Sequence, residues 1–209
     1  MPRVTSTTLR AASAALLVAA LGLGAGPDPG AAHAIPADPP ERSAVRTHLL
    51  DPERLPALAG REWKVRPGLG HSDAAAVGAC QKTPLNTLGA VATGHRHFTA
   101  GRGIRATQVV ARFVDPRSAW RAHQVLRAWR ADCEERVTHV AVGPLEPVYV
   151  RTGTADTYRA SYPRSGAAGI AMHRSGAYLT IVEVTATPPR YPASWDPVRK
   201  AVRRIARTF

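Results

Sequence analysis

The clearest pattern of hydrophobic and polar positions lies in the middle of the chain. Residues 105–114 alternate with a period of two, which predicts a strand with two distinct faces. The faces carry Val109, Ala111 and Phe113 on one side and Gln108, Val110 and Arg112 on the other. Asp115 and Pro116 follow as an N-cap and a proline at the first helical position, so we expect the strand to lead directly into a helix.

After Pro116 the hydrophobic period changes to that of a helix. If each residue advances by about 100° from Ala119, the apolar positions fall within an arc of about 120°. These positions are Ala119, Ala122, Val125, Leu126, Trp129 and Cys133. The helix is therefore predicted to pack one face on a sheet. Trp120 lies about 100° from Ala119, on the side away from this stripe.

A second amphipathic helix is predicted at the end of the chain, where Asp196 and Pro197 repeat the cap-then-proline pattern. Its apolar residues, spread over an arc of about 60°, are Val198, Val202, Ile205 and Phe209. The opposite side carries Arg199, Lys200, Arg203, Arg204 and Arg207. This helix should also cover a sheet with its apolar face and leave its basic face outside.

Short alternating or apolar segments, separated by glycine and proline, predict further strands. They cover residues 62–65, 97–100, 137–142, 147–151, 157–162, 170–173 and 177–185, with Trp63 facing inward. Turns at residues 101–103 and 174–176 predict two hairpins. Upstream, Asp51 and Pro52 predict a short capped helix. The order of these elements indicates an α+β fold, a mostly antiparallel β-sheet flanked by helices.

The first 34 residues have the pattern of a Sec-type signal peptide. Arg3 and Arg10 precede an apolar run over residues 11–26, and Ala32-His33-Ala34 offers an A-x-A cleavage site before Ile35. No cysteine follows the run closely, so the chain is not expected to be a lipoprotein. We expect a flexible leader over residues 35–46, a folded domain over residues 47–209 and a secreted, extracellular protein. An uncleaved membrane anchor is the alternative.

The chain has two cysteines, Cys80 and Cys133. In an exported protein an even number of cysteines predicts a disulfide, here a single bridge within the chain. A metal or redox pair would need a C-x-x-C or Cys/His ligand spacing, which the sequence lacks. The formal net charge of +13 comes mainly from arginine within a composition rich in Ala, Arg, Gly and Pro. Because that bias is typical of a GC-rich genome, we do not take it as evidence of nucleic acid binding.

Five motifs in this order resemble the PknH-like extracellular sensor domain. They are LLDPERLPAL (residues 49–58), Cys80-Gln81, QVVARFVD (108–115) leading into a helix, Trp129-x-x-x-Cys133, and the hairpin AMHRSGAYLTIVEV (171–184) before a terminal helix. The resemblance spans about residues 45–209. That family includes kinase ectodomains and stand-alone secreted or lipid-anchored proteins of actinomycetes.

The resemblance implies an antiparallel sheet flanked by helices, with a cleft for an unidentified ligand. It therefore implies a sensor-like, ligand-binding domain of the bacterial cell envelope. The kinase members carry a second disulfide that this chain cannot form, and the sequence has no kinase motif or stop-transfer segment. Signalling across a membrane is therefore not implied for this chain.

The sequence contains no recognised catalytic motif, so no catalytic residues, cofactor or metal are expected. G-x-S-x-G, H-E-x-x-H and a phosphate-binding glycine loop are all missing. His95 and His97 would share one strand face, but without a third ligand nearby we interpret them as surface histidines. An unrecognised hydrolase is the alternative to a non-catalytic protein.

Two surfaces are candidates for binding. Trp120, flanked by Arg117, Arg121 and Arg127, could stack on a ligand or partner, unless a neighbouring loop covers it. The basic side of the last helix could hold a cell-wall polyanion or a membrane surface, unless it is only a solvated face. The leading hypothesis is a secreted, non-catalytic ligand-binding domain. A polyanion- or membrane-binding protein that uses the last helix is the alternative.

Overall fold

The computed structural model describes residues 44–57, 61–67, 76–163, 166–187 and 196–209. The predicted signal peptide and most of the predicted leader lie outside these residues. Residues 44–46, at the end of that leader, form a helical turn in which Val45 is buried. The side chain of Val45 packs on Gly94, where an added Cβ would come within 3.2 Å of it.

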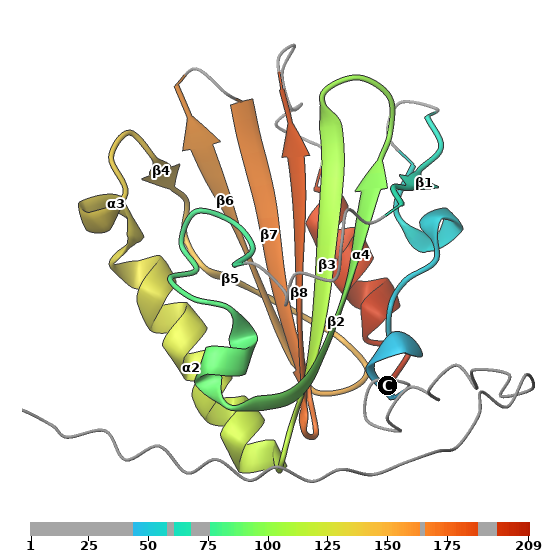
Figure 1. The fold of residues 1–209 in the computed structure, drawn as a ribbon. Helices are drawn as coiled ribbons and strands as arrows, with labels where there is room; N and C mark the ends of the chain where they lie inside the picture. Colours follow the sequence, from blue (N-terminus) through green and yellow to red (C-terminus); the bar gives the residue numbers. More distant parts are fainter. Residues whose placement is uncertain (1–43, 58–60, 68–75, 164–165, 188–195) are drawn as a thin grey trace, which may run out of the picture. The chain divides into compact units, whose positions relative to one another are not determined.

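Eight strands form one sheet in the order β1-β2-β3-β8-β7-β6-β4, and β5 pairs with β6 (Figure 1). The strands are β1 (Lys64–Val65), β2 (Ala90–Thr99), β3 (Ile104–Phe113), β4 (Ala141–Val142), β5 (Glu146–Val148), β6 (Thr154–Tyr162), β7 (Gly166–Ser175) and β8 (Tyr178–Ala186). Each of these pairs is antiparallel. The helices are η1 (Pro52–Arg54), η2 (Leu85–Leu88), α2 (Pro116–Ala131), α3 (Cys133–Arg136) and α4 (Pro197–Ile205). The predicted α+β fold is confirmed.

The two predicted hairpins form at the predicted turns. Gly101 and Gly103 have φ of 73° and 76°, a backbone conformation that a side chain disfavours, and the turn closes with Ala100 N–H donating to Ile104 O at 3.1 Å. Strand β2 is longer than predicted, because it begins at Ala90 rather than at His97. Its first seven residues, AVATGHR, lack regular alternation, and the strand extends over them because they pair with β3.

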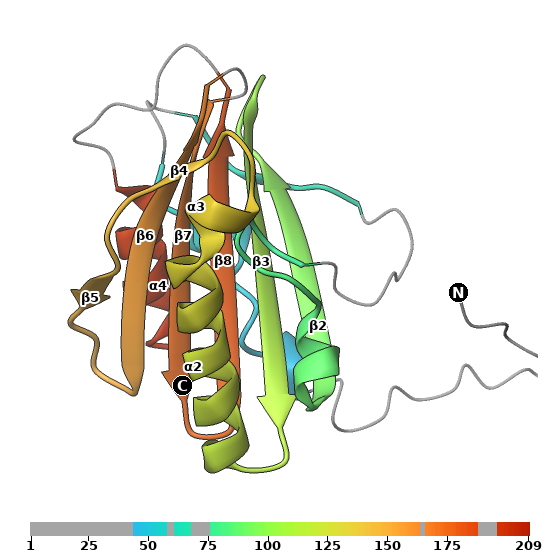
Figure 2. The ribbon, with the colours of Figure 1, turned by 90° about the vertical axis from the view of Figure 1, so that its left-hand side faces the viewer.

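Helices α2 and α4 lie on opposite faces of the sheet, as Figure 2 shows. Alternate residues of β3 account for this arrangement, since Val109, Ala111 and Phe113 pack in the core beneath α2. Ala106 packs in the core beneath α4. The faces of β3 are therefore divided as its alternation predicted.

Most of the predicted apolar stripe of each helix is buried, although Val125 of α2 is only partly buried. Ala119, Ala122 and Leu126 of α2 contact the first core, and Val198, Val202 and Ile205 of α4 contact the second. The structure differs at the end of the chain, because α4 ends at Ile205 and Phe209 lies beyond it. The ring of Phe209 stacks on His48, with ring centroids 3.9 Å apart.

The segment before β1 is attached to the sheet by a buried side chain of β3. Gln108 is fully buried and accepts a hydrogen bond from Leu50 N–H at 2.8 Å, while its amide donates to His48 O at 3.0 Å. The predicted short helix is only the 3₁₀ turn η1, and Asp51 makes no capping hydrogen bond. Its carboxylate instead accepts a hydrogen bond from Arg96 at 3.0 Å. The same guanidinium group donates to Leu50 O, which places it beside Asp51.

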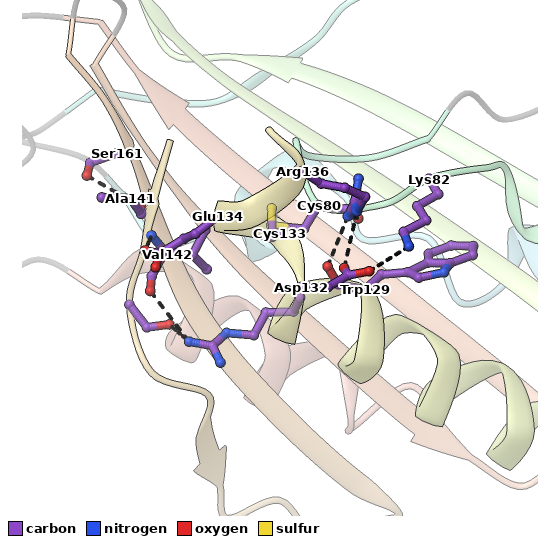
Figure 3. Close-up of a disulfide and its surroundings, with 12 residues drawn as sticks. Cys80, Lys82, Trp129, Asp132, Cys133, Glu134, Arg136, Ala141, Val142 and Ser161 are labelled. Carbon is purple, nitrogen blue, oxygen red and sulfur yellow. Dashed lines mark hydrogen bonds and ion pairs between the residues drawn. A yellow bond between two sulfur atoms is a disulfide. The ribbon is translucent and has the colours of Figure 1, made fainter. Parts of the chain in front are cut away.

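The predicted disulfide forms between Cys80 and Cys133, whose Cα atoms are 5.2 Å apart (Figure 3). Both cysteines are buried in the α2 core. The bridge ties the segment before η2 to the junction of α2 and α3. Around it, Asp132 accepts from Lys82 at 2.6 Å and from Arg136 at 3.2 Å, and Arg136 also donates to Cys80 O at 2.9 Å.

Replacing Cys80 and Cys133 together by alanine should lower the free energy of unfolding by about 4 kcal/mol, since the bridge closes a loop between residues 53 apart. Urea unfolding at equilibrium under oxidising conditions measures the difference. As a control, adding reductant should destabilise the wild type by a similar amount and leave the variant unchanged. A variant within about 1 kcal/mol of the oxidised wild type would contradict this account.

Candidate functional site

The outer face of α2 begins at a well-defined helix start. The Asp115 carboxylate accepts a hydrogen bond from Ser118 N–H at 2.6 Å and a second from the Ser118 hydroxyl at 3.2 Å. The backbone hydrogen bond from Ser118 is the main reason that the pKa of Asp115 is lowered. The ionised cap fixes the first turn, and with it the direction in which each later side chain of α2 points.

Trp120 points away from the core, as its position on the helix predicted. Its side chain is 49% exposed, whereas Ala119 and Ala122 on the inner stripe are buried. Arg117 and Arg121 are exposed beside it. The sequence PRSAWRAHQVLRAWRA of α2 contains no acidic residue, and the carboxylate at its N-cap, Asp115, interacts with the charge of Arg121. The outward orientation of Trp120 is confirmed, and its role as a contact stays a prediction.

Arg127 differs from the other two arginines of the predicted group, because it contacts a carboxylate of the sheet. Its Nε lies 3.9 Å from Oδ2 of Asp156 in β6, and Nε2 of His123 lies 3.2 Å from the same oxygen. His123 and Asp156 are buried. The His123 ring makes no hydrogen bond through Nε2, so proximity alone relates it to the carboxylate. Arg127 therefore balances the charge of Asp156, and we assign it less weight in binding.

The sequence analysis did not identify His123 or Asp156. His123 lies at about 40° on the helical projection that starts at Ala119, at the margin of the apolar stripe. That position would have suggested a half-buried histidine. Asp156 carries no comparable signal, because a single aspartate in a strand is read as a solvent-facing residue until its neighbours are known.

The basic side of α4 is only partly available for binding. Arg199 pairs with Asp196 at 3.0 Å and with Glu146, and Arg204 donates to Arg54 O at 2.6 Å. These two arginines hold α4 against its neighbours. Lys200, Arg203 and Arg207 are exposed to solvent. The predicted five-residue basic face thus reduces to three exposed cations.

Glu183 of β8 is a second polar group that the sequence analysis did not identify. It points to the α2 side of the sheet, where the segment before Cys80 crosses over it and Gly78 N–H donates to its carboxylate. Burial raises the pKa of Glu183 to about 7, although the hydrogen bond from Gly78 opposes the shift. Burial also raises the pKa of Tyr158 and of Tyr162, with a smaller contribution from the charge of Glu183. The carboxyl group therefore anchors this segment to the sheet.

A small cavity lies between α2 and the sheet, in the α2 core. It is lined mainly by apolar side chains, with Gln81 and Tyr158 as polar groups, and its volume is about 10 Å³. That is room for about one water molecule. Ligand pockets occupy about 300–1,000 Å³, so this cavity is not the ligand cleft that the resemblance implies.

His95 and His97 lie on the same side of β2, with ring centroids 5.2 Å apart. His97 forms a hydrogen bond with the Thr107 hydroxyl at 3.1 Å, and burial is the main cause that lowers the pKa of His97. Among the described residues, no group of three or more His, Cys, Asp or Glu side chains is arranged to hold a metal ion.

Comparisons with known proteins give no match to a protein-family model, a curated protein or a solved structure. The described part of the chain has no helix that combines the length and the apolar character needed to cross a membrane.

The raised pKa of Glu183 predicts a pH-dependent stability. Because the pKa is about 7 in the folded protein and about 4.5 in the unfolded chain, the folded state binds the proton more tightly. Its contribution is fully present below pH 4.5 and is lost as the pH rises through 7, a change of about 3 kcal/mol.

Substituting Glu183→Gln should remove this component of the pH dependence. The free energy of unfolding of the wild type relative to the variant should therefore fall between pH 5 and pH 8, as measured by urea unfolding at both values. Glu135→Gln, an exposed substitution of the same kind, controls for the loss of one carboxyl group. An unchanged difference between the wild type and Glu183→Gln at the two pH values would contradict the assignment.

Proposed function

We propose that this protein is an exported, non-catalytic binding domain that acts at the bacterial cell envelope and holds its ligand or partner on the outer face of α2. The observation that carries the proposal is the exposure of Trp120 between Arg117 and Arg121 on a helix without acidic residues. Tryptophan and arginine are the residues that contribute most to binding interfaces. The indole offers apolar area and the guanidinium groups offer charge and planar hydrogen bonding.

The packing of α2 makes this surface available without a change of fold. The helix already buries Ala119, Ala122 and Leu126, so Trp120 is not needed to cover the sheet. The disulfide at Cys133 and the cap at Asp115 fix the two ends of α2. A rigid helix presents its side chains with little loss of conformational entropy on binding, which favours affinity.

Two further features support export and a non-catalytic role. A buried disulfide persists in oxidising compartments, which agrees with the predicted signal peptide and with the resemblance to secreted sensor domains. The buried ionisable groups near α2 contact one another or the backbone, as with His123 and Asp156 or Glu183 and Gly78. These contacts supply packing and anchoring, a structural role that also perturbs pKa values.

The proposal predicts that material from the cell envelope co-purifies with the protein and that Trp120→Ala lowers its amount by about tenfold or more, the size expected of a central binding residue. Mass spectrometry of protein secreted by its native host measures the bound material. Tyr149→Ala is a matched control, since Tyr149 is an aromatic residue that is 90% exposed outside α2. Recovery of the same material in the same amount with Trp120→Ala would exclude this surface.

A second candidate function rests on α4, which has no acidic residue, and on the residues just after it: Lys200 and Arg203 of the helix and Arg207 beyond its end are exposed. Such a face could bind a polyanion of the cell wall through charge alone. Retention on purified, phosphate-bearing wall polymer should then fall steeply with salt, and reversing the three charges to glutamate should abolish it. Retention that survives Lys200→Glu, Arg203→Glu and Arg207→Glu together would rule out this function.

A further inference from the structure

Three exposed apolar side chains lie near one end of the fold. Among the described residues, five large hydrophobic side chains are exposed: Val65, Val91, Val114, Trp120 and Tyr149. Three of these belong to adjoining pieces of chain. Val114 lies between the end of β3 and the start of α2, Val91 lies at the start of β2, and Trp120 lies in the second turn of α2.

The antiparallel pairing explains why these pieces meet. Strand β2 begins where β3 ends, with Ala90 paired to Phe113, and α2 starts directly after β3. Figure 2 shows the start of α2, the end of β3 and the start of β2 at the same end of the sheet. Val114 is 71% exposed and Val91 is 47% exposed there. We call Val91, Val114, Arg117, Trp120 and Arg121 the α2 docking end.

The charge at the α2 docking end is positive. Arg117 and Arg121 are exposed in the first two turns of α2, on either side of Trp120. The nearest acidic group in the sequence is Asp115, whose carboxylate caps the helix by accepting from Ser118 and also interacts with the charge of Arg121, so it offsets part of the positive charge. This end therefore combines exposed apolar side chains with guanidinium groups, and α2 itself supplies no carboxylate to neutralise them.

We propose that the α2 docking end attaches the protein peripherally to anionic phospholipid membranes. This inference rests on the proposed function, because it names the partner of the same surface. Tryptophan is enriched at the membrane–water interface, where its ring is apolar and its N–H remains hydrated. Arginine next to anionic headgroups adds electrostatic attraction. Burial of apolar side chains at the headgroup boundary and attraction of cations to anionic lipids are the two contributions to interfacial membrane binding.

In the part of the chain that the structure describes, the α2 docking end has exposed large apolar side chains and the α4 face has cations without them, and this difference favours a membrane partner at α2. None of the five exposed large hydrophobic side chains of the described residues belongs to α4, although Lys200 and Arg203 are exposed there. A wall polymer needs only cations, whereas valine and tryptophan side chains gain free energy when they leave water for the acyl boundary. The two faces therefore suit different partners, a polymer at α4 and a lipid surface at α2.

The test uses co-sedimentation of the purified protein with vesicles of phosphatidylcholine mixed with phosphatidylglycerol, and with vesicles of phosphatidylcholine alone. All variants carry the same N-terminal segment, so differences between them report on the substituted surface. Each lost arginine contact should weaken binding about fivefold, and reversal of its charge should weaken it further. Arg117→Glu with Arg121→Glu should therefore lower the partition coefficient by about 25-fold or more.

The matched control is Lys200→Glu with Arg203→Glu, which changes the net charge equally on the opposite face of the sheet. It should weaken binding by less than about fivefold, through long-range charge alone. A blue shift of tryptophan fluorescence on adding mixed vesicles should also disappear with Trp120→Phe. Equal weakening by the two double charge reversals, or a blue shift that survives Trp120→Phe, would overturn the inference.

The two experiments together distinguish a wrong lipid partner from a wrong binding surface, which is the proposed function on which this inference rests. If envelope material co-purifies in a manner that depends on Trp120 but the mixed vesicles do not bind, the binding surface stands and the lipid partner is wrong. If neither the co-purified material nor the vesicles depend on Trp120, both proposals fail. Because the substituted residues are exposed, each variant should keep the urea unfolding transition of the wild type, which verifies that it is folded.

Discussion

The sheet must be covered on both faces, and this requirement organises the rest of the structure. Its central strands β3 and β8 place apolar side chains on each side, as the split of Val109 and Ala106 between two cores shows. Exposing either face would leave large apolar areas in water, so α2 and α4 are both needed. Small residues on α2, Ala119 and Ala122, let that helix lie close to the sheet. Because these contacts hold α2 against the sheet, the opposite side of the helix forms a fixed outer surface.

Irregular segments are held on each face by a covered polar side chain from a central strand, fully buried at Gln108 and partly buried at Glu183. Gln108 of β3 receives the backbone of His48 and Leu50 on the α4 side, and Glu183 of β8 receives Gly78 on the α2 side. Backbone groups of a segment without regular structure need such partners when they are covered. Gln108 and Glu183 thus supply hydrogen-bond partners to backbone groups of the segments before β1 and before Cys80, as strand pairing does within the sheet.

The sequence allowed prediction of those features that depend on local periodicity. The stripes of α2 and α4, the alternation of β3, the two hairpins and the disulfide all follow from spacing within a short window. The polar groups beneath α2 could not be predicted in this way. Glu183 is largely covered because a segment about a hundred residues earlier crosses over it, and Asp156 lies beside His123 and Arg127 of a helix that is distant in sequence. Trp120 was predictable in orientation, because its direction is a property of the helix alone.

Comparison of two tryptophans on α2 shows why the outer face calls for a functional explanation. Trp129 is partly buried and packs against the α2 core, so the fold accounts for it. Trp120, nine positions earlier, points to the other side and is 49% exposed, so packing does not account for its size or its apolar character. A polar residue there would serve the helix equally well, since side chains outside the buried stripe add little to stability. The large indole between two arginines is therefore better explained by something that it contacts outside the domain.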